Sequence, residues 1–152
     1  MGGKGMIKKI ILTLALSGIL LQASAFSENI AVIVNKDSPL FSLKASPELK
    51  DIKNIYLGKT RFAGGSLVKA TNQNNKELIT RFIKKVCQME VNEYQYLWVK
   101  LEFETGISAP KVTENSDEII DYVQREKNAI GYVWESQLKD ATGIKVALLI
   151  PE

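Results

Sequence analysis

The chain contains no histidine and only one cysteine, Cys87. The missing histidine excludes Ser-His-Asp triads, Cys-His pairs and His-ligated zinc. A single cysteine forms neither an internal disulfide nor a thiolate metal site. Cys87 follows Val86 in a helical pattern, so we expect a small buried side chain rather than a reactive thiol. These absences predict a protein with no metal and no cofactor.

Two patterns that often mark enzymes are incomplete. The tripeptide GKT at Gly58–Thr60 lacks the glycine that a P-loop places five residues before its second glycine, because Lys53 stands there. It also follows a helical pattern, so we interpret Gly58 as a helix stop. Glu102 and Glu104 lie two residues apart and diverge on a helix. The sequence therefore predicts no catalytic residues and no enzyme.

Acidic residues are absent from the first 25 residues, which instead carry three lysines. An apolar run at Ile10–Leu21 follows the lysines, and Ala-Ser-Ala at Ala23–Ala25 is typical of a cleavage site. We predict a signal peptide over 1–25 and one domain over 26–152, located in the periplasm or secreted. The alternative is an uncleaved anchor, but the run is short for a membrane span. Met6 is an alternative start.

The predicted mature domain has no excess of either charge. The 20 basic residues less the three lysines of the signal leave 17, equal to the 17 acidic residues. A neutral domain lacks the basic footprint of a nucleic-acid-binding protein. We therefore expect no nucleic-acid partner and, after cleavage, no stable membrane span.

Short apolar runs alternate with helical patterns along this domain. The continuous run Ile30–Val34 predicts a strand buried on both faces, as in a parallel sheet. Ser46 and Pro47 predict the start of a helix that Gly58 ends. We expect further strands at Ser66–Thr71, Ala129–Trp134 and Ile144–Ile150, further helices from Asn75, over Val91–Phe103 and over Ser116–Asn128, and a loop at Glu104–Val112. The fold class is α/β, with a mostly parallel or mixed sheet and flanking helices.

The loop after the second strand is the candidate ligand site. In open α/β sheets, ligands bind outside the carboxyl ends of strands, where the next helix offers unpaired N–H groups. Polar residues gather at this position: Thr71, Asn72, Gln73, Asn74 and Asn75, with Lys76 adding charge. The competing interpretation is a solvated turn followed by a helix cap.

Four segments occur in a characteristic order: IAVIVNKDSP, LKDIKNIYLGKTRFAGGSLVKATNQ, LWVKLEFETGISAP and AIGYV, within Glu28–Val133. Their order resembles the phosphate-type periplasmic substrate-binding proteins of ABC transporters, in a short form. The resemblance implies one lobe of a type II periplasmic binding fold, an ABC transporter as partner and a small anion such as phosphate as ligand. It adds four residues to the expected ligand site: Asn35, Ser38, Thr105 and Gly106.

The chain also departs from this family. The family's phosphate loop resembles Arg-Ser-x-Gly-Ser-Gly-Thr, whereas Thr71–Asn75 supplies mainly amides. Short relatives often carry an arginine where this chain has Ile79. Two functions therefore stay open: a solute-binding protein, or a protein-interaction module that keeps the fold and forms a homodimer or binds another partner. An enzyme ranks last.

Overall fold

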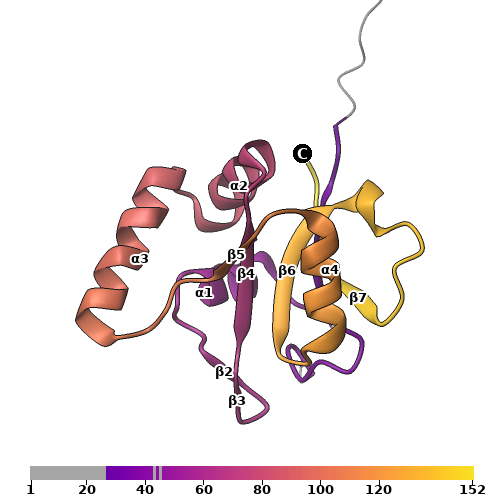
Figure 1. The fold of residues 1–152 in the computed structure, drawn as a ribbon, viewed down its shortest axis with the longest axis horizontal. Coiled ribbons are helices and arrows are strands. Elements are labelled where there is room, and N and C mark those ends of the chain that lie inside the picture. The colour runs from indigo at the N-terminus through magenta and orange to yellow at the C-terminus, as the bar shows by residue number, and fades with distance from the viewer. Residues whose placement is uncertain (1–26, 43, 45) are drawn as a thin grey trace, which may run out of the picture.

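The computed structural model describes residues 27–42, 44 and 46–152, so the predicted signal peptide lies outside the described residues. Seven strands and four α-helices follow one another (Figure 1): β1 Ile30–Asn35, α1 Leu49–Tyr56, β2 Phe62–Ala63, β3 Ser66–Leu67, β4 Lys69–Gln73, α2 Lys76–Phe82, α3 Val91–Thr105, β5 Lys111–Thr113, α4 Ser116–Arg125, β6 Ala129–Trp134 and β7 Ile144–Ile150. A π-helical turn, Ile83–Cys87, prolongs α2, and a 3-10 turn, Glu135–Leu138, follows β6.

Five of the strands form one mixed sheet in the order β5-β4-β6-β1-β7. β4 is parallel to β5 and to β6, whereas β1 is antiparallel to β6 and to β7. The predicted α/β class with a mixed sheet is confirmed. The expectation that Ile30–Val34 pairs in a parallel manner is wrong. The strand is buried on both faces because helices cover both faces of the sheet, and this burial does not depend on strand direction.

The helices form two layers around the sheet (Figure 1). One core joins Val32 and Tyr132 of the sheet to α1, α2 and α3, and its centre is aromatic. The Phe82 and Tyr132 rings are stacked with centroids 3.6 Å apart. A second, smaller core joins the other face of the sheet to Ile119 and Val123 of α4.

Gly131 in β6 allows α4 to lie close to the sheet. A Cβ atom at Gly131 would come within 2.5 Å of a methyl group of Ile119 and 2.6 Å of the hydroxyl of Thr71. Only glycine fits between a strand and a helix at this separation. The position of α4, and of the groups at its two ends, therefore depends on this residue.

Most expected elements occur, with three local differences. α1 begins at Leu49 after the cap residue Glu48, two residues later than Ser46 and Pro47 suggest. The expected strand Ser66–Thr71 is divided between a small hairpin with β2 and the strand β4. The expected loop Glu104–Val112 ends in the edge strand β5, which is too short for its alternation to be recognised in sequence.

The direction of the strands gives the sheet two distinct edges. We call the carboxyl edge the one at which β4, β5 and β6 end, and the amino edge the one at which they begin. β1 runs the other way, so Ile30 lies at the carboxyl edge and Asn35 at the amino edge. α2 and α4 both begin at the carboxyl edge, because each follows a parallel strand.

Candidate functional site

A crevice of about 300 Å³ opens at the carboxyl edge, between the ends of β4 and β5. Its lining is polar and comes from three connections of the chain: Gln73, Asn74, Asn75, Glu114, Asn115, Ser116 and Gln137. This is the place where an open α/β sheet binds ligands, because two helix starts and the strand ends meet there. The loop after β4, predicted as the site, forms one wall.

Two buried polar side chains form the floor of the crevice. Gln73 is 2% exposed and donates from Nε2 to the carbonyl of Tyr132 at 2.8 Å. The Ser116 hydroxyl lies 2.7 Å from Oε1 of Gln137 and 3.4 Å from Oε1 of Gln73. These contacts fix the floor, because a buried polar group without a partner is costly. The walls, by contrast, consist of exposed side chains, namely several amides and the carboxylate of Glu114.

The helices α2 and α4 both begin at this crevice, and each is capped by an asparagine. The Asn75 side chain accepts a hydrogen bond from the Leu78 N–H at 3.1 Å, and Asn115 accepts one from the Glu118 N–H at 3.0 Å. Asn75 is thereby confirmed as a helix cap. The N–H groups of the first helical residues, Lys76 and Ser116, have no acceptor among the described residues. They remain available to an oxyanion.

The charge of the crevice is close to balanced. Each helix start is equivalent to roughly half a positive charge, so two of them offer about one unit. Glu114, which lines the crevice, opposes them with its carboxylate, 3.4 Å from Nδ2 of Asn74. No lysine or arginine is among the lining residues. N–H groups and side-chain amides would hold an anion here, and the carboxylate of Glu114 would repel it.

Thr71 and Asn72, also predicted for the site, lie below the crevice within the sheet. Thr71 donates to the Ile130 carbonyl at 3.1 Å. Asn72 accepts from the Tyr132 hydroxyl at 2.9 Å, and its Nδ2 lies 3.4 Å from the Tyr94 hydroxyl. Both side chains are buried and have partners in the core. In this polar run the strand occupies Thr71 to Gln73, and only the residues from Gln73 onward reach the crevice.

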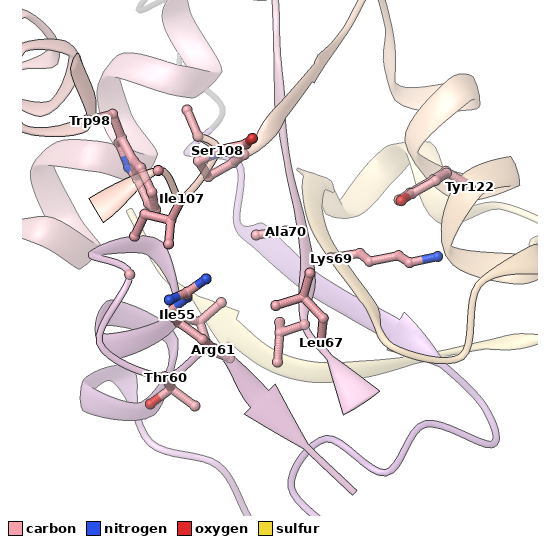
Figure 2. Close-up of a pocket in the computed structure, with 15 residues that line it drawn as sticks. Ile55, Thr60, Arg61, Leu67, Lys69, Ala70, Trp98, Ile107, Ser108 and Tyr122 are labelled. Carbon is pink, nitrogen blue, oxygen red and sulfur yellow. The ribbon is translucent and has the colours of Figure 1, made fainter. Parts of the chain in front are cut away.

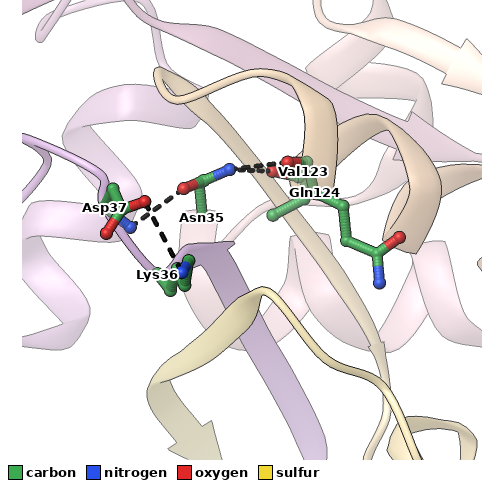
Figure 3. Close-up of polar contacts among 5 residues, drawn as sticks. All are labelled: Asn35, Lys36, Asp37, Val123 and Gln124. Atoms are coloured by element: carbon green, nitrogen blue, oxygen red, sulfur yellow. Dashed lines mark hydrogen bonds and ion pairs between the residues drawn. The ribbon is translucent and has the colours of Figure 1, made fainter.

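Asn35 lies at the opposite, amino edge (Figure 3), and Ser38 follows it there, with its N–H bonded to the Asn35 carbonyl. The Asn35 amide donates to the carbonyls of Val123 and Gln124, at 3.0 and 2.8 Å, and so closes the last turn of α4. Its oxygen accepts from the Asp37 N–H at 2.9 Å. The sequence places these residues in one site with Asn75, but the antiparallel direction of β1 separates them. The polar end of β1 anchors a helix.

Thr105 and Gly106 also lie away from the crevice, at the end of α3. The Thr105 hydroxyl donates to the Leu101 carbonyl, and Gly106 ends the helix with a φ of 70°. Lys76 is exposed beside the crevice and is not part of its lining. The sequence prediction missed Glu114, Asn115, Ser116 and Gln137. The sequence Asn-Ser-Asp-Glu is typical of a helix start and could have identified Asn115 as a cap residue. No sequence pattern distinguishes Gln137.

Other chemistry finds no support in the described part of the chain. Residues 27–42, 44 and 46–152 contain no cluster of three metal-binding side chains. Within the same ranges, no helix has the length and apolarity to cross a membrane. Cys87 is 2% exposed, and burial raises the pKa of its thiol to about 12. It is the buried side chain that the sequence predicts.

Comparison with known proteins gives the fold a context. A scan against protein-family models and a search of curated proteins both find no match. Solved structures do match. One, from Clostridium perfringens, is a candidate phosphate ABC transporter substrate-binding protein with bound phosphate; it is 21% identical, with a TM-score of 0.60. Another, from Planctomyces limnophilus, is a candidate phosphate-binding protein, 10% identical with a TM-score of 0.54.

The match covers most of this chain but less than half of each neighbour. It spans 79% of this chain in both cases, and 44% and 40% of the two neighbours. At these identities the likeness shows a shared fold. The predicted α/β architecture is therefore confirmed, and the chain shares its fold with part of each of these two proteins.

Proposed function

We propose that this protein is an exported solute-binding lobe, and that the carboxyl-edge crevice takes a small oxyanion such as phosphate. The observation that carries the proposal is the convergence of two capped helix starts, with the free N–H of Ser116 in the lining, over the buried floor of Gln73 and Ser116. The fold shared with a phosphate-bound structure supports it. An ABC transporter is the partner that this function would serve.

The charge balance of the crevice makes the proposal specific. The carboxylate of Glu114 cancels most of the positive potential of the helix starts, so a fully ionised anion binds weakly. A hydrogen phosphate ion still carries a proton, which it can donate to this carboxylate while its other oxygens accept from N–H groups. Sulfate has no such proton at neutral pH. We therefore expect phosphate to bind more tightly than sulfate.

Thermal unfolding with and without phosphate, sulfate and chloride tests the proposal. Phosphate at one hundred times its dissociation constant should stabilise the protein by about 2.7 kcal/mol, a shift of several degrees. The double variant Asn74→Asp, Asn75→Asp should abolish the shift, because it adds two carboxylates to the crevice wall. The absence of a shift with any anion would overturn the phosphate proposal.

Glu114→Gln provides the sharper arm of this experiment. Removing the opposing carboxylate should tighten phosphate binding roughly fivefold, since exposed charges interact by about 1 kcal/mol. It should also reduce the preference for phosphate over sulfate. Glu104→Gln is the matched control, because it makes the same charge change on α3, outside the crevice. An equal gain in phosphate affinity in Glu114→Gln and Glu104→Gln would show a general effect of net charge and would contradict a site at the crevice.

One observation favours a second function, a protein-interaction module. α3 buries Tyr94 and Trp98, but on its other side it exposes Tyr96, Val99 and Phe103, at 73%, 64% and 93%. Their spacing of three and four residues forms a continuous apolar stripe. Light scattering over a range of concentrations tests whether the protein forms a homodimer, and Phe103→Asp should then restore the monomer.

A further inference from the structure

A second hollow lies at the amino edge, away from the carboxyl-edge crevice. It measures about 360 Å³ and passes beneath the loop Gly106–Pro110 that leads into β5 (Figure 2). Its walls come from the end of α1, the strand pair β2–β3, the start of β4, the helix α3 and, on the far side, Tyr122 of α4. We call it the amino-edge cavity. It shares no lining residue with the carboxyl-edge crevice.

The walls of the amino-edge cavity combine polar and apolar surface in about equal parts. Trp98, Ile107, Leu67 and Ile55 line it. The Trp98 N–H donates to the Tyr56 carbonyl at 3.1 Å, so its polar atom already has a partner. Trp98 and Ile55 are buried, so Leu67 and Ile107 supply most of the apolar surface that is open to a ligand. Leu67 is 50% exposed at this wall. Covering such a surface with an apolar group is favourable, because it removes apolar area from water.

Gly58 keeps this space open. It has a φ of 71°, and a Cβ atom there would lie 3.0 Å from the Trp98 ring. The left-handed backbone ends α1 and turns the chain toward Thr60 and Arg61, which also line the cavity. The sequence GKT, which resembles a phosphate-binding motif, thus shapes the wall of the amino-edge cavity.

Arg61 is the cation that remains available to a ligand. No carboxylate of the described residues lies within 4.0 Å of its guanidinium, which in Figure 2 lies beside Ile55 and below Ile107. Lys69 extends away toward Tyr122 and forms an ion pair with Glu126. A planar guanidinium matches the two oxygens of a carboxylate and binds them in a bidentate manner.

We propose that the amino-edge cavity binds a small amphipathic carboxylate. Its apolar body would cover Trp98, Ile107 and Leu67, and its carboxylate would meet Arg61 at the mouth. The volume lies in the range of small-molecule sites. A lining of mixed polar and apolar surface, in which Lys69 is paired and Arg61 is available, suits a ligand with an apolar body and a carboxylate. This proposal does not rest on the solute-binding function of the carboxyl-edge crevice, because each uses its own residues.

Trp98 fluorescence can report binding directly. The chain has two tryptophans, and Trp134 lies at the carboxyl edge against Arg81, so Trp134→Phe leaves Trp98 as the single reporter. The protein purified from expression of the full chain is titrated with phenylacetate and hexanoate. Phenylacetamide and hexanamide serve as neutral probes of the same shape. We expect saturable changes with the acids and at least tenfold weaker binding of the amides.

Two substitutions at neighbouring positions locate the charge. Arg61→Gln should weaken binding of phenylacetate by about tenfold, and Arg61→Lys by less, because it keeps the charge but loses the fork. Lys59→Gln is the matched control. It also removes one positive charge, only two residues from Arg61, but the Lys59 side chain does not line the cavity. Both positions are exposed, so neither substitution threatens the fold. Leu67→Asp tests the apolar wall and should also weaken binding.

The possible outcomes separate this site from the crevice. Binding that Arg61→Gln weakens and that Lys59→Gln and phosphate leave unchanged supports the proposal. The proposal would be overturned if neither acid gave a saturable change in Trp98 fluorescence, or if the acids and their amides bound equally well. It would also be overturned if Arg61→Gln and Lys59→Gln weakened binding to the same extent. Competition by phosphate that persists unchanged in Arg61→Gln would place the ligand at the carboxyl edge and would also overturn it.

Discussion

The two edges of the sheet differ in what the fold provides and what the side chains add. At the carboxyl edge the backbone favours an anion, because two helices begin there, yet Glu114 opposes it and no cation lines the crevice. At the amino edge no helix begins over the cavity, but Arg61 lines a cavity of mixed polar and apolar surface. The position of a site is therefore set by topology, and its ligand by a few side chains.

The largest effect on this comparison should come from Gly131→Ala, because it moves the element that both edges share. The new methyl group would meet Ile119 and Thr71, and we expect a loss of about 3 kcal/mol in the free energy of unfolding. Urea denaturation measures it. Gly65→Ala is the control: no atom lies within 4 Å of the added carbon, so only backbone strain of about 1 kcal/mol applies. Similar losses in both variants would contradict the close packing of α4.

Asn35→Ala should act on the amino edge alone. It removes two hydrogen bonds to the last carbonyls of α4, and we expect a loss of about 2 kcal/mol in urea denaturation. Phosphate binding at the carboxyl edge should stay unchanged in the folded variant. A selective loss of phosphate binding would return Asn35 to the ligand site that the sequence predicts.

Gly58→Ala should reduce stability by about 1 to 2 kcal/mol, because alanine is strained at positive φ. The added carbon also touches the Trp98 ring, so the fluorescence of Trp98 should change in the folded protein. Differential scanning calorimetry and emission spectra measure the two effects. An unchanged spectrum would show that Trp98 does not close on Gly58.

The smallest effect concerns the ion pair at the mouth of the amino-edge cavity. The hydrogen bond from Lys69 lowers the pKa of Glu126 below its ordinary value of 4.5, and Glu126 raises the pKa of Lys69. The pair's contribution to stability is complete at neutral pH. It is lost as the pH falls through the folded pKa of Glu126, or rises through that of Lys69.

Carboxyl NMR titration measures this pKa. Lys69→Gln should return the pKa of Glu126 toward its ordinary value. It should also weaken the binding of carboxylates in the amino-edge cavity less than Arg61→Gln does, because Lys69 is already paired with Glu126. A Glu126 that titrates normally in the unaltered protein would contradict the pairing. Glu118→Gln, near the carboxyl edge, is the control that leaves Glu126 unchanged.

The sequence by itself determined the local elements. Apolar runs predicted β1, β6 and β7, and Asn75 and Gly58 predicted a helix start and a helix end, because caps and turns depend on neighbouring residues. It also predicted the polar loop after β4, and the order of its segments predicted the fold.

Only the tertiary structure decided which of these residues share a site. Strand direction is not encoded in a buried apolar run, so Asn35 moved to the opposite edge from Asn75. Glu114, Ser116 and Gln137 reach the crevice through pairing between distant segments, and Thr71 and Asn72 withdraw into the core because the strand continues through them. Contacts of this kind join residues that sequence patterns treat separately, and they decide where each charge lies.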